Sequence, residues 1–476
     1  MPSSTKPNLL TWAVSTLLLQ PWTVNAQVSN SSCGSVIERD VLVIGGGSSG
    51  THAAVQLMEA GKSFAILEKQ DELGGYVATY TDPSTNKTMD YGVVVFKNTT
   101  TSYNYLTNQL GASMGEFKGF YEGGKTKYLD YTNGNEVSGP VPGANVTEAE
   151  QIYLKQMQTY GNLFAGPGFD MPDPIPEDLL LPFGEWVKKY HAEAMAYNVY
   201  YLHAGIVLDM TTLNVMKYHS QNEYTTGSLY IQNRGNQALY NLAYSKLGGG
   251  ENVFLESNIQ SLTRSENGVE AIVQRPCGTQ TFRAKKVIIA IRPRNSDLKQ
   301  FLDLRPNEER IFSEFSHIHS YTCILNGTGL PIDTGYQLVD LTRTGGIPMV
   351  PEAIGISQSG FRDREARAFW WTTPDEISAE KATSNLLRTA YFVQGLQGAQ
   401  SPEGERPTIN GLVHNSPYFM HPSREAIARG FYKDLYGLQG QLNTFWTGAA
   451  WESESSPTIW AFNEKIMIPQ ILQSLA

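Results

Sequence analysis

The chain has 476 residues, with 36 Lys and Arg against 46 Asp and Glu, and a formal net charge of −10. A chain of this length can form two or three domains, each with a substantial hydrophobic core. Its acidic balance provides no basic surface for nucleic acid or anionic lipid, which excludes proteins that bind those partners by charge. Length and composition agree with a large, well-packed globular protein.

The N-terminal residues have the layout of a secretory signal peptide. Lys6 precedes an apolar run over residues 9–19, and residues 24–26 (Val-Asn-Ala) supply a small-residue cleavage site. A membrane span needs about 20 apolar residues. This run is shorter, and no later stretch of the sequence qualifies. The sequence predicts that residues 1–26 are removed and that the mature protein is secreted or enters the lumen of the secretory pathway.

Two further features bear on that compartment. Five N-x-Ser/Thr sequons predict glycosylation in a secretory lumen. They are at Asn30, Asn86, Asn98, Asn145 and Asn326. The three cysteines, Cys33, Cys277 and Cys323, are too few for a disulfide framework, and their odd number leaves at least one unpaired within the chain.

Residues 40–69 contain a complete strand, glycine turn, helix and strand. Gly45, Gly47 and Gly50 fit the pattern G-x-G-x-x-G. The first glycine permits a tight turn, the second lets the backbone approach a pyrophosphate, and the third lets the helix pack on the strand. Glu68 lies 18 positions after Gly50, where an acid accepts the ribose hydroxyls. This unit predicts a dinucleotide-binding site.

The expected helix covers residues 51–60. Its N-terminus, preceded by Ser48 and Ser49, would present free N–H groups and the positive end of the helix dipole to the phosphates. A second glycine pair, Gly74 and Gly75, follows soon after the ribose acid. It would bring another backbone segment against the pyrophosphate. Nicotinamide dehydrogenases do not need this second glycine pair. The second pair therefore narrows the prediction to FAD.

These motifs resemble the flavin-containing amine oxidase superfamily. Its pattern continues into residues 90–93 (Asp-Tyr-Gly-Val), which implies that Gly92 and Val93 lie near the flavin. Residues 252–264 are similar to the strand pair that contacts adenine, near Ile259, and residues 284–293 to the strand that returns to the cofactor domain. Residues 443–451 resemble the segment in which a Gly-Ala backbone, here Gly448 and Ala449, approaches the flavin.

A narrower resemblance is to a subgroup of secreted fungal flavoproteins, the β-cyclopiazonate dehydrogenase type. It rests on residues 70–75, 80–83 and 90–93, and on the C-terminal run 430–440 leading into 446–451. The resemblance implies an oxidation that prepares a scaffold for cyclisation. It identifies a kind of flavoprotein and leaves the substrate open.

The resemblance implies an α/β fold: an FAD-binding Rossmann-like domain of the amine oxidase type, interleaved with a helical lid and an antiparallel-sheet substrate domain. The cofactor domain would comprise residues 35–96, 228–293 and 438–476, and the substrate domain residues 97–227 and 294–437. Apolar spacing predicts helices and strands in the second domain. The helices are 148–164, 182–195 and 211–219, the strands 312–324, 336–342 and 368–373, and the expected surface loops 131–145 and 395–410.

The sequence departs from the amine oxidase pattern at two positions. The strand 316–325 carries no lysine where many amine oxidases place one near the flavin N5, and residues 456–458 read Ser-Pro-Thr where a cage tyrosine is common. Both changes argue against oxidation of simple amines. No cysteine lies near the C-terminal segment. We therefore expect FAD to be held non-covalently.

No catalytic acid or base transfers from the family to this sequence, and no metal site is predicted. The candidate substrate-side residues are His203, Tyr218, His219, His319, His414, Tyr418, His421 and Trp446. Trp446 is favoured among them because it precedes Thr447-Gly448 and would place an aromatic wall beside the flavin. His319, His414 and His421 are retained as weaker catalytic candidates.

The sequence thus predicts an FAD-dependent oxidoreductase that removes a hydride from a C–N or C–C bond of a small secondary metabolite. Two alternatives remain open at this point. One is a redox-neutral flavin isomerase that shifts a double bond, and the other is a flavin-binding protein without turnover. The electron acceptor is also open, with O2 as one candidate.

Overall fold

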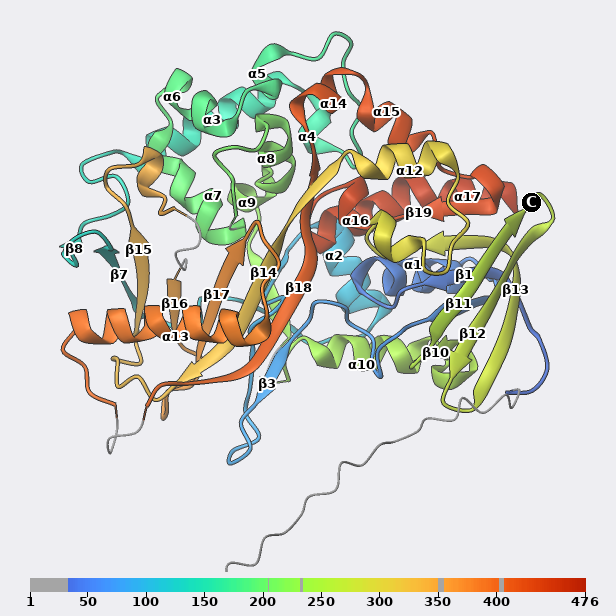
Figure 1. Cartoon of the computed structure of the whole chain (residues 1–476), viewed down its shortest axis with the longest axis horizontal. Coiled ribbons are helices and arrows are strands. Elements are labelled where there is room, and N and C mark those ends of the chain that lie inside the picture. Colours follow the sequence, from blue (N-terminus) through green and yellow to red (C-terminus); the bar gives the residue numbers. More distant parts are fainter. Residues whose placement is uncertain (1–32, 204, 232–233, 350–354, 402–405) are drawn as a thin grey trace, which may run out of the picture.

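The computed structural model describes residues 33–203, 205–231, 234–349, 355–401 and 406–476. The predicted signal peptide and Asn30 lie outside these residues. Figure 1 shows two seven-stranded sheets, one to the right and one to the left, with a group of helices above the left sheet. The predicted α/β class is confirmed.

The first sheet carries the glycine turn. Its order is β10-β2-β1-β13-β12-β11, with β19 also paired to β13. The strands are β1 (Ile37–Ile44), β2 (Phe64–Leu67), β10 (Val253–Phe254), β11 (Asn258–Ser265), β12 (Gly268–Arg275), β13 (Gly278–Ile289) and β19 (Thr444–Trp446). All four residues of β2 and the last four of β1 are buried. Such unbroken apolar runs are expected of parallel strands covered on both faces.

Strand β13 joins three distant parts of the chain. On one side β13 pairs in parallel with β1. On the other side it pairs first with β12, which is antiparallel to it, and then with β19, which is parallel. The register aligns Ile44 with Leu67 of β2, and both Ile44 and Trp446 with Ile289. The segments that follow these strands therefore leave the sheet at one edge, the carboxyl edge at which open α/β sheets bind ligands.

The second sheet has the order β18-β14-β17-β16-β15-β7-β8. Its pairs are antiparallel except β15 with β7. The strands are β7 (Lys125–Asp130), β8 (Glu136–Val137), β14 (Phe315–Asn326), β15 (Thr334–Val339), β16 (Gly355–Ser359), β17 (Arg367–Thr373) and β18 (Thr408–Pro422). Helix α13 (Ala379–Leu396) lies across this sheet (Figure 1).

Smaller strands and the helices complete the structure. The small strands are β3 (Thr79–Thr81) with β4 (Thr88–Asp90), and β5 (Phe96–Lys97), β6 (Met114–Glu116) and β9 (Ser228–Ile231). Beside the first sheet lie α1 (Ser48–Glu59), α2 (Thr100–Tyr103), α10 (Gln237–Lys246), α11 (Asn295–Leu298), α12 (Pro306–Ser313), α16 (Ser456–Phe462) and α17 (Ile468–Ser474). The upper helices are α3 (Val146–Thr159), α4 (Asn162–Ala165), α5 (Glu177–Leu180), α6 (Phe183–Tyr190), α7 (Ala196–His203), α8 (Thr212–Tyr218), α9 (Asn222–Thr225), α14 (Arg424–Ala428) and α15 (Phe431–Tyr436).

Several predicted boundaries need correction. The strand expected from residue 312 begins at Phe315, because α12 extends to Ser313. The loop expected at 131–145 contains the short strand β8, and the loop expected at 395–410 overlaps the end of α13 and the start of β18. Both expected loops contain or adjoin glycines. Glycine indicates a turn, but it does not indicate where the neighbouring helix or strand ends.

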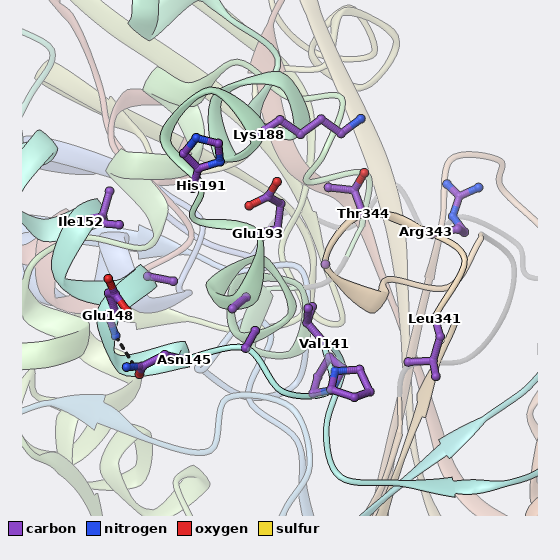
Figure 2. A pocket seen from close by; sticks show the side chains of 16 residues that line it. Val141, Asn145, Glu148, Ile152, Lys188, His191, Glu193, Leu341, Arg343 and Thr344 are labelled. Carbon is purple, nitrogen blue, oxygen red and sulfur yellow. Dashed lines mark hydrogen bonds between the residues drawn. The ribbon is translucent and has the colours of Figure 1, made fainter.

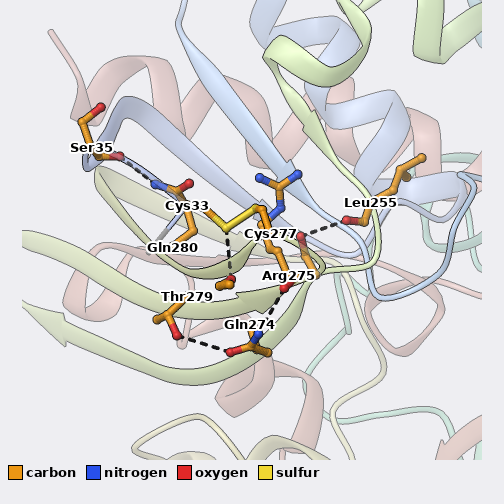
Figure 3. The surroundings of a disulfide bond; sticks show 10 residues. Cys33, Ser35, Leu255, Gln274, Arg275, Cys277, Thr279 and Gln280 are labelled. Carbon is orange, nitrogen blue, oxygen red and sulfur yellow. Dashed lines mark hydrogen bonds between the residues drawn. A yellow bond between two sulfur atoms is a disulfide. The ribbon is translucent and has the colours of Figure 1, made fainter. Parts of the chain in front are cut away.

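A disulfide fastens the start of the described chain to the first sheet. Cys33 bonds Cys277, which lies in the turn between β12 and β13 (Figure 3). Backbone N–H of Cys33 donates to Thr279 O at 2.9 Å, and Gln280 Nε2 donates to Ser35 O at 2.6 Å. Cys323 is the unpaired cysteine and is buried.

A buried ion pair fixes helix α12 to the first sheet. Both terminal guanidinium nitrogens of Arg264 donate to the carboxylate of Glu308, at 2.7 and 2.8 Å. The side chains are 0% and 2% exposed. The same carboxylate accepts from backbone N–H of Arg305 at the start of the helix. Removal of Glu308 would leave the buried guanidinium of Arg264 with only the largely exposed Asp303, 3.1 Å from its Nε, as counter-ion.

We therefore predict that Glu308→Gln lowers the free energy of unfolding by about 3 kcal/mol, the lower end of the cost of breaking a buried pair. The control is Glu270→Gln, which breaks the exposed pair between Glu270 and Arg283. That change should cost less than about 1 kcal/mol. Urea unfolding of both variants measures the difference, and equal losses would contradict the prediction.

Candidate cofactor and substrate site

The predicted glycine turn lies at the carboxyl edge of the first sheet. Gly45 has a φ of +100°, which favours glycine. A Cβ on Gly50 would lie 2.0 Å from the carbonyl oxygen of Gly45, so only glycine permits this approach of helix and turn. Gly47 is the N-cap residue of α1, and because it has no side chain, no capping hydrogen bond forms there.

Helix α1 therefore begins with unpaired backbone donors. The first turn of an α-helix leaves its N–H groups without partners in the helix, here including those of Ser48, Ser49 and Gly50. A Cβ on Gly47 would have Gly75 Cα, at 3.6 Å, as its nearest neighbour. The donors and the missing side chain together form a cradle suited to a pyrophosphate.

The second glycine pair packs against this turn. Gly74 and Gly75 have φ values of +136° and +64°. Gly74 N donates to Gly46 O at 3.0 Å, and a Cβ on Gly75 would lie 3.0 Å from Gly47 Cα. Two backbone segments thus meet where both lack side chains. This close approach could not be read from either motif alone.

Glu68 lies immediately after β2 and beside the turn. Its carboxylate accepts from Gly46 N at 2.6 Å and from Gln70 N at 2.8 Å. Its backbone oxygen accepts from Ser257 N at 2.8 Å. The chain then enters β11, which includes Ile259. The predicted ribose acid and the predicted adenine segment are therefore adjacent.

Asp90 holds the segment that contains Gly92 and Val93. Its carboxylate accepts from Asn236 N at 2.9 and 3.0 Å and from the Thr79 hydroxyl at 2.5 Å. Burial raises the pKa of Asp90 to about 6. Asn236 Nδ2 donates to Val93 O at 2.7 Å, so the Asp90–Asn236 contact fixes this backbone on the cofactor side of the sheet.

The C-terminal segment closes over the start of α1. A Cβ on Gly448, whose φ is +115°, would lie 3.6 Å from Ser49 Oγ. Asn463 Nδ2 donates to Ser49 O at 3.0 Å. Ser48 Oγ donates to Ser456 Oγ at 2.8 Å. Gly448 and Ala449 therefore lie beside the donors of the helix.

Five separate segments thus converge at one edge of the sheet. They are the glycine turn, the Glu68 strand end, the second glycine pair, the Asp90–Val93 segment and the Gly448–Ala449 turn. Backbone donors, an acid and close glycine contacts are what an adenine dinucleotide requires. The residues present fit such a cofactor. Whether each predicted residue touches it stays a prediction.

A small cavity lies between this C-terminal segment and the helices. Its wall draws on the loop after α4, on α8, β18 and α15, and on the segment after Gly448. The lining residues are Phe169, Asn214, Tyr218, Met420, His421, Tyr432, Ala449, Ala450, Glu452, Ser453 and Glu454. Ala449 connects this cavity to the predicted flavin-contacting turn.

Two polar atoms in the cavity wall have no hydrogen-bond partner among the described residues. They are the buried Tyr218 hydroxyl and Asn214 Nδ2. Asn214 Oδ1 accepts from the Tyr432 hydroxyl at 2.7 Å, so the amide orientation is set and its nitrogen remains available. An unpaired buried polar group costs free energy unless a ligand satisfies it. Both groups can donate to an oxygen of a substrate.

His421 supplies a titratable group to the same cavity. Its Nδ1 lies 2.7 Å from Phe419 O. A carbonyl oxygen only accepts, so Nδ1 carries the proton and Nε2 of the neutral ring is an acceptor. Burial lowers the pKa of His421, which favours this neutral form. The Nε2 atom can therefore take a proton.

Charged groups around the cavity are paired. Arg292 forms an ion pair with Glu454 at 2.5 Å, and Glu454 also accepts from Phe419 N at 2.9 Å. On the other side, Lys217 donates to Gly168 O, while Glu452 accepts from Gly168 N. Burial lowers the pKa of Lys217 and raises that of Glu452. The Arg292–Glu454 ion pair and the hydrogen bond from Gly168 to Glu452 tie other parts of the chain to the C-terminal segment.

The structure corrects the placement of Trp446. Its side chain is 0% exposed and packs on Trp451 and Phe312, with ring centroids 5.6 and 5.0 Å away. An indole with no exposed surface in the ligand-free chain cannot line a cavity. Trp446 belongs to the core because β19 pairs with the buried end of β13.

The other candidate side chains fall into separate groups. His203 and His219 contact each other at 3.0 Å between helices α7 and α8, and burial lowers the pKa of His203 to about 3. His319 and His414 contact each other on β14 and β18 and do not line the cavity. Tyr418 is half-buried beside Phe419, at 5.9 Å between ring centroids. Of the eight candidates, only Tyr218 and His421 line the cavity.

The sequence analysis missed Asn214, Arg292, Lys217, Glu452 and Glu454. Lys217 and Asn214 fall in a segment predicted as helix, where apolar spacing alone was used. A lysine among the buried positions of that helix was the available signal. Glu452 and Glu454 lie three and five residues after Ala449, so their place near the site could have been inferred from the Gly-Ala turn.

A cleft of about 520 Å³ lies elsewhere, beside the starts of α3 and η4 (Thr344–Gly346) and the end of α6 (Figure 2). Its wall carries charges of both signs, including Lys188, Glu193 and Arg343. Asn145 caps α3 there by accepting from Glu148 N at 3.1 Å. The cleft shares no lining residue with the cavity beside Ala449.

Known proteins are similar both to the region of the glycine turn and to nearly the whole chain. The family pattern for an NAD(P)-binding Rossmann-like domain matches residues 43–110. The FAD-dependent oxidoreductase oblC of Cochliobolus heterostrophus is 34% identical over 478 residues, which covers 96% of this chain and 95% of that protein. The β-cyclopiazonate dehydrogenase of Aspergillus oryzae is 33% identical over 453 residues, covering 90% and 92%.

Solved structures show the same fold at low sequence identity. A CLA-producing fatty acid isomerase from P. acnes has a TM-score of 0.71 at 16% identity, covering 90% of this chain and 98% of that one. Putrescine oxidase bound to putrescine has a TM-score of 0.65 at 16% identity, covering 92% and 100%. These likenesses confirm the predicted architecture.

Fold and site together define a dinucleotide-binding oxidoreductase with the amine oxidase architecture. The chain belongs to the family of fungal FAD-dependent oxidoreductases. The predictions of an enzyme and of FAD as its cofactor are confirmed by this membership.

We predict that Gly47→Val abolishes FAD binding without unfolding the chain. Its φ of −73° is accessible to any residue, and a Cβ meets nothing closer than 3.6 Å in the protein, yet the side chain would occupy the pyrophosphate cradle. The ratio of flavin to protein absorbance measures binding, and circular dichroism measures folding.

The control is Gly139→Val, a position where a Cβ meets nothing within 4 Å. It should retain FAD, and acid denaturation of that protein should release the flavin into solution. Wild-type FAD content in Gly47→Val would contradict the assignment of the cradle.

Proposed function

We propose that the enzyme removes a hydride from a C–N or C–C bond of a small, largely apolar secondary metabolite. The observation that carries this proposal is its similarity, over nine tenths of the chain, to fungal oxidoreductases that include β-cyclopiazonate dehydrogenase. When bound, the flavin supplies the hydride acceptor. The protein must then hold the substrate and take up the proton that leaves with the hydride.

The walls of the cavity beside Ala449 carry groups for those two tasks. Its volume of about 10 Å³ holds about one water, so a substrate must push the wall residues apart. Aromatic and thioether side chains, from Phe169, Tyr432 and Met420, provide an apolar wall. The Tyr218 hydroxyl and Asn214 Nδ2 donate to one oxygen of the substrate, which satisfies both unpaired groups. This arrangement favours a substrate that carries a carbonyl or enolate oxygen close to the bond that is oxidised.

His421 is the proposed proton acceptor. Its Nδ1–H is held by Phe419 O, which leaves Nε2 as the basic atom. Phe419 N is in turn held by Glu454, and Glu454 by Arg292. The ion pair therefore positions the strand that carries the imidazole. A base and two hydrogen-bond donors in one apolar cavity would supply the proton transfer and the substrate contacts, and bound flavin would accept the hydride.

Anaerobic incubation of the holoenzyme with β-cyclopiazonate, putrescine and a polyunsaturated fatty acid tests the proposal. We expect β-cyclopiazonate, the substrate named for the A. oryzae relative, to bleach the flavin absorbance and yield a product two hydrogens poorer. Putrescine should leave the flavin oxidised, since the sequence lacks the N5 lysine and the cage tyrosine. Rapid reduction by putrescine, or rearrangement of the fatty acid without net reduction, would overturn it.

We predict that His421→Asn lowers the rate of flavin reduction 10²–10⁴-fold, the usual contribution of a general base. In the wild type, flavin reduction should slow as the pH falls through the pKa of His421, because the protonated ring cannot accept a proton. Burial places this pKa below the ordinary histidine value. The variant should lose that pH step and keep its FAD. Stopped-flow absorbance measures both.

His191→Asn is the matched control. His191 is exposed, ends α6 with a φ of 55°, and asparagine tolerates that conformation. Its reduction rate should equal that of the wild type. If His421→Asn retains both the rate and the pH step, His421 is not the base.

We further propose that the enzyme works outside the cytosol. Support comes from the signal-like N-terminus, the sequons and the disulfide between Cys33 and Cys277, a bond that forms in oxidising compartments. Asn86, Asn98 and Asn145 are exposed, whereas Asn326 is half-buried. No helix in the described part of the chain is long and apolar enough to cross a membrane.

Expression in a filamentous fungus checks this compartment. We predict that the protein is secreted into the culture medium, begins at Gln27 and loses mass after peptide N-glycosidase treatment. The variant Asn98→Gln should lose one glycan, whereas Asn326→Gln should change little because that side chain is half-buried. Retention in the cell with Met1 still present would contradict the proposal.

A further inference from the structure

Two histidines and a glutamate meet on the second sheet, away from the substrate cavity. His319 lies on β14 and His414 on the neighbouring strand β18, while Glu376 lies between β17 and α13. One ligand atom from each residue lies within 4.8 Å of the others. None of the three lines the cavity beside Ala449.

The two imidazoles already have the separation of metal ligands. His319 Nδ1 lies 3.2 Å from His414 Nε2. Two nitrogens bound to a tetrahedral zinc ion at about 2.0–2.1 Å lie about 3.3 Å apart. In the ion-free chain, one ring nitrogen must donate a proton to the other. A metal ion would replace that proton and bind both lone pairs.

The charges around the pair favour a cation. Carboxylates of Glu376 and Asp375 face His319, and Arg294 is the opposing cation. The donor set of two imidazoles and a carboxylate suits Zn²⁺ better than Mg²⁺ or Ca²⁺.

Tyr321 holds two of the ligands in place. Its ring stacks on His414, with centroids 4.4 Å apart and an interplanar angle of 0°. Its hydroxyl donates to Ile377 O at 2.9 Å and accepts from Ile377 N at 3.1 Å. One tyrosine thus orients the imidazole of His414 and fixes the residue next to Glu376. Such support from neighbouring side chains is typical of protein metal sites.

We propose that His319, His414 and Glu376 bind one divalent transition-metal ion, Zn²⁺ by preference, with water completing the coordination. The ion would link β14, β18 and the start of α13. Glu376 is exposed, so its side chain can close the remaining distance to the ion. The proposed role is to fasten the helix to the sheet, and it does not depend on the substrate of the enzyme.

Isothermal titration of tag-free holoenzyme with ZnCl₂ at pH 7.5, after dialysis against a chelator, tests this site. We expect one Zn²⁺ per chain. His414→Ala and Glu376→Gln should each weaken binding at least tenfold, because each removes a ligand. His317→Ala is the matched control, since His317 lies 5.3 Å from His319 on the same strand but outside the set.

A second readout separates specific binding from surface association. Zn²⁺ should raise the thermal midpoint of the wild type and of His317→Ala, but not that of His414→Ala, since a ligand that binds only the folded state stabilises it. MgCl₂ should have no effect on any of them. The proposal is overturned if His414→Ala and Glu376→Gln bind Zn²⁺ as the wild type does, or if the wild type binds none.

Discussion

The contact between Gly47 and Gly75 is the constraint on which the cofactor site depends. Each residue lacks a side chain where the two backbones meet, and a Cβ on Gly75 would lie 3.0 Å from Gly47 Cα. The approach leaves the first turn of α1 uncovered, so its N–H groups can receive phosphates. Glu68 is fixed beside the same turn by Gly46 N and Gln70 N.

The sheet register extends this constraint to the rest of the molecule. Ile44, Leu67, Ile289 and Trp446 end their strands at one edge, although they come from four separate parts of the chain. The segments after them therefore converge without further adjustment. Trp446 stays in the core, and the Gly448 turn that follows it reaches the start of α1. The packing of Trp446 in the core thus positions the backbone of the Gly448 turn at the cofactor site.

The cavity gains its chemistry from elements outside that sheet. Helix α8 brings Asn214 and Tyr218, and β18 brings His421, while the C-terminal segment brings Ala449. The ion pair of Arg292 with Glu454 supports the strand. Lys217 and Glu452 both hydrogen-bond to the backbone of Gly168 and so support the loop before α5. Helices α8 and α15, strand β18 and the segment after Gly448 therefore meet at this cavity.

The sequence by itself determined the dinucleotide unit, because its parts are consecutive within residues 40–69 and each glycine has a local steric reason. The second glycine pair narrowed this to FAD, and resemblance extended it to the interleaved architecture. The tertiary structure alone decided which face of β19 carries Trp446, because a strand buried on both faces has no polar alternation to indicate the direction of its side chains. It also decided that Cys33 pairs with Cys277, and that His319 meets His414 across 95 residues. Such contacts depend on strand register, which local sequence does not specify.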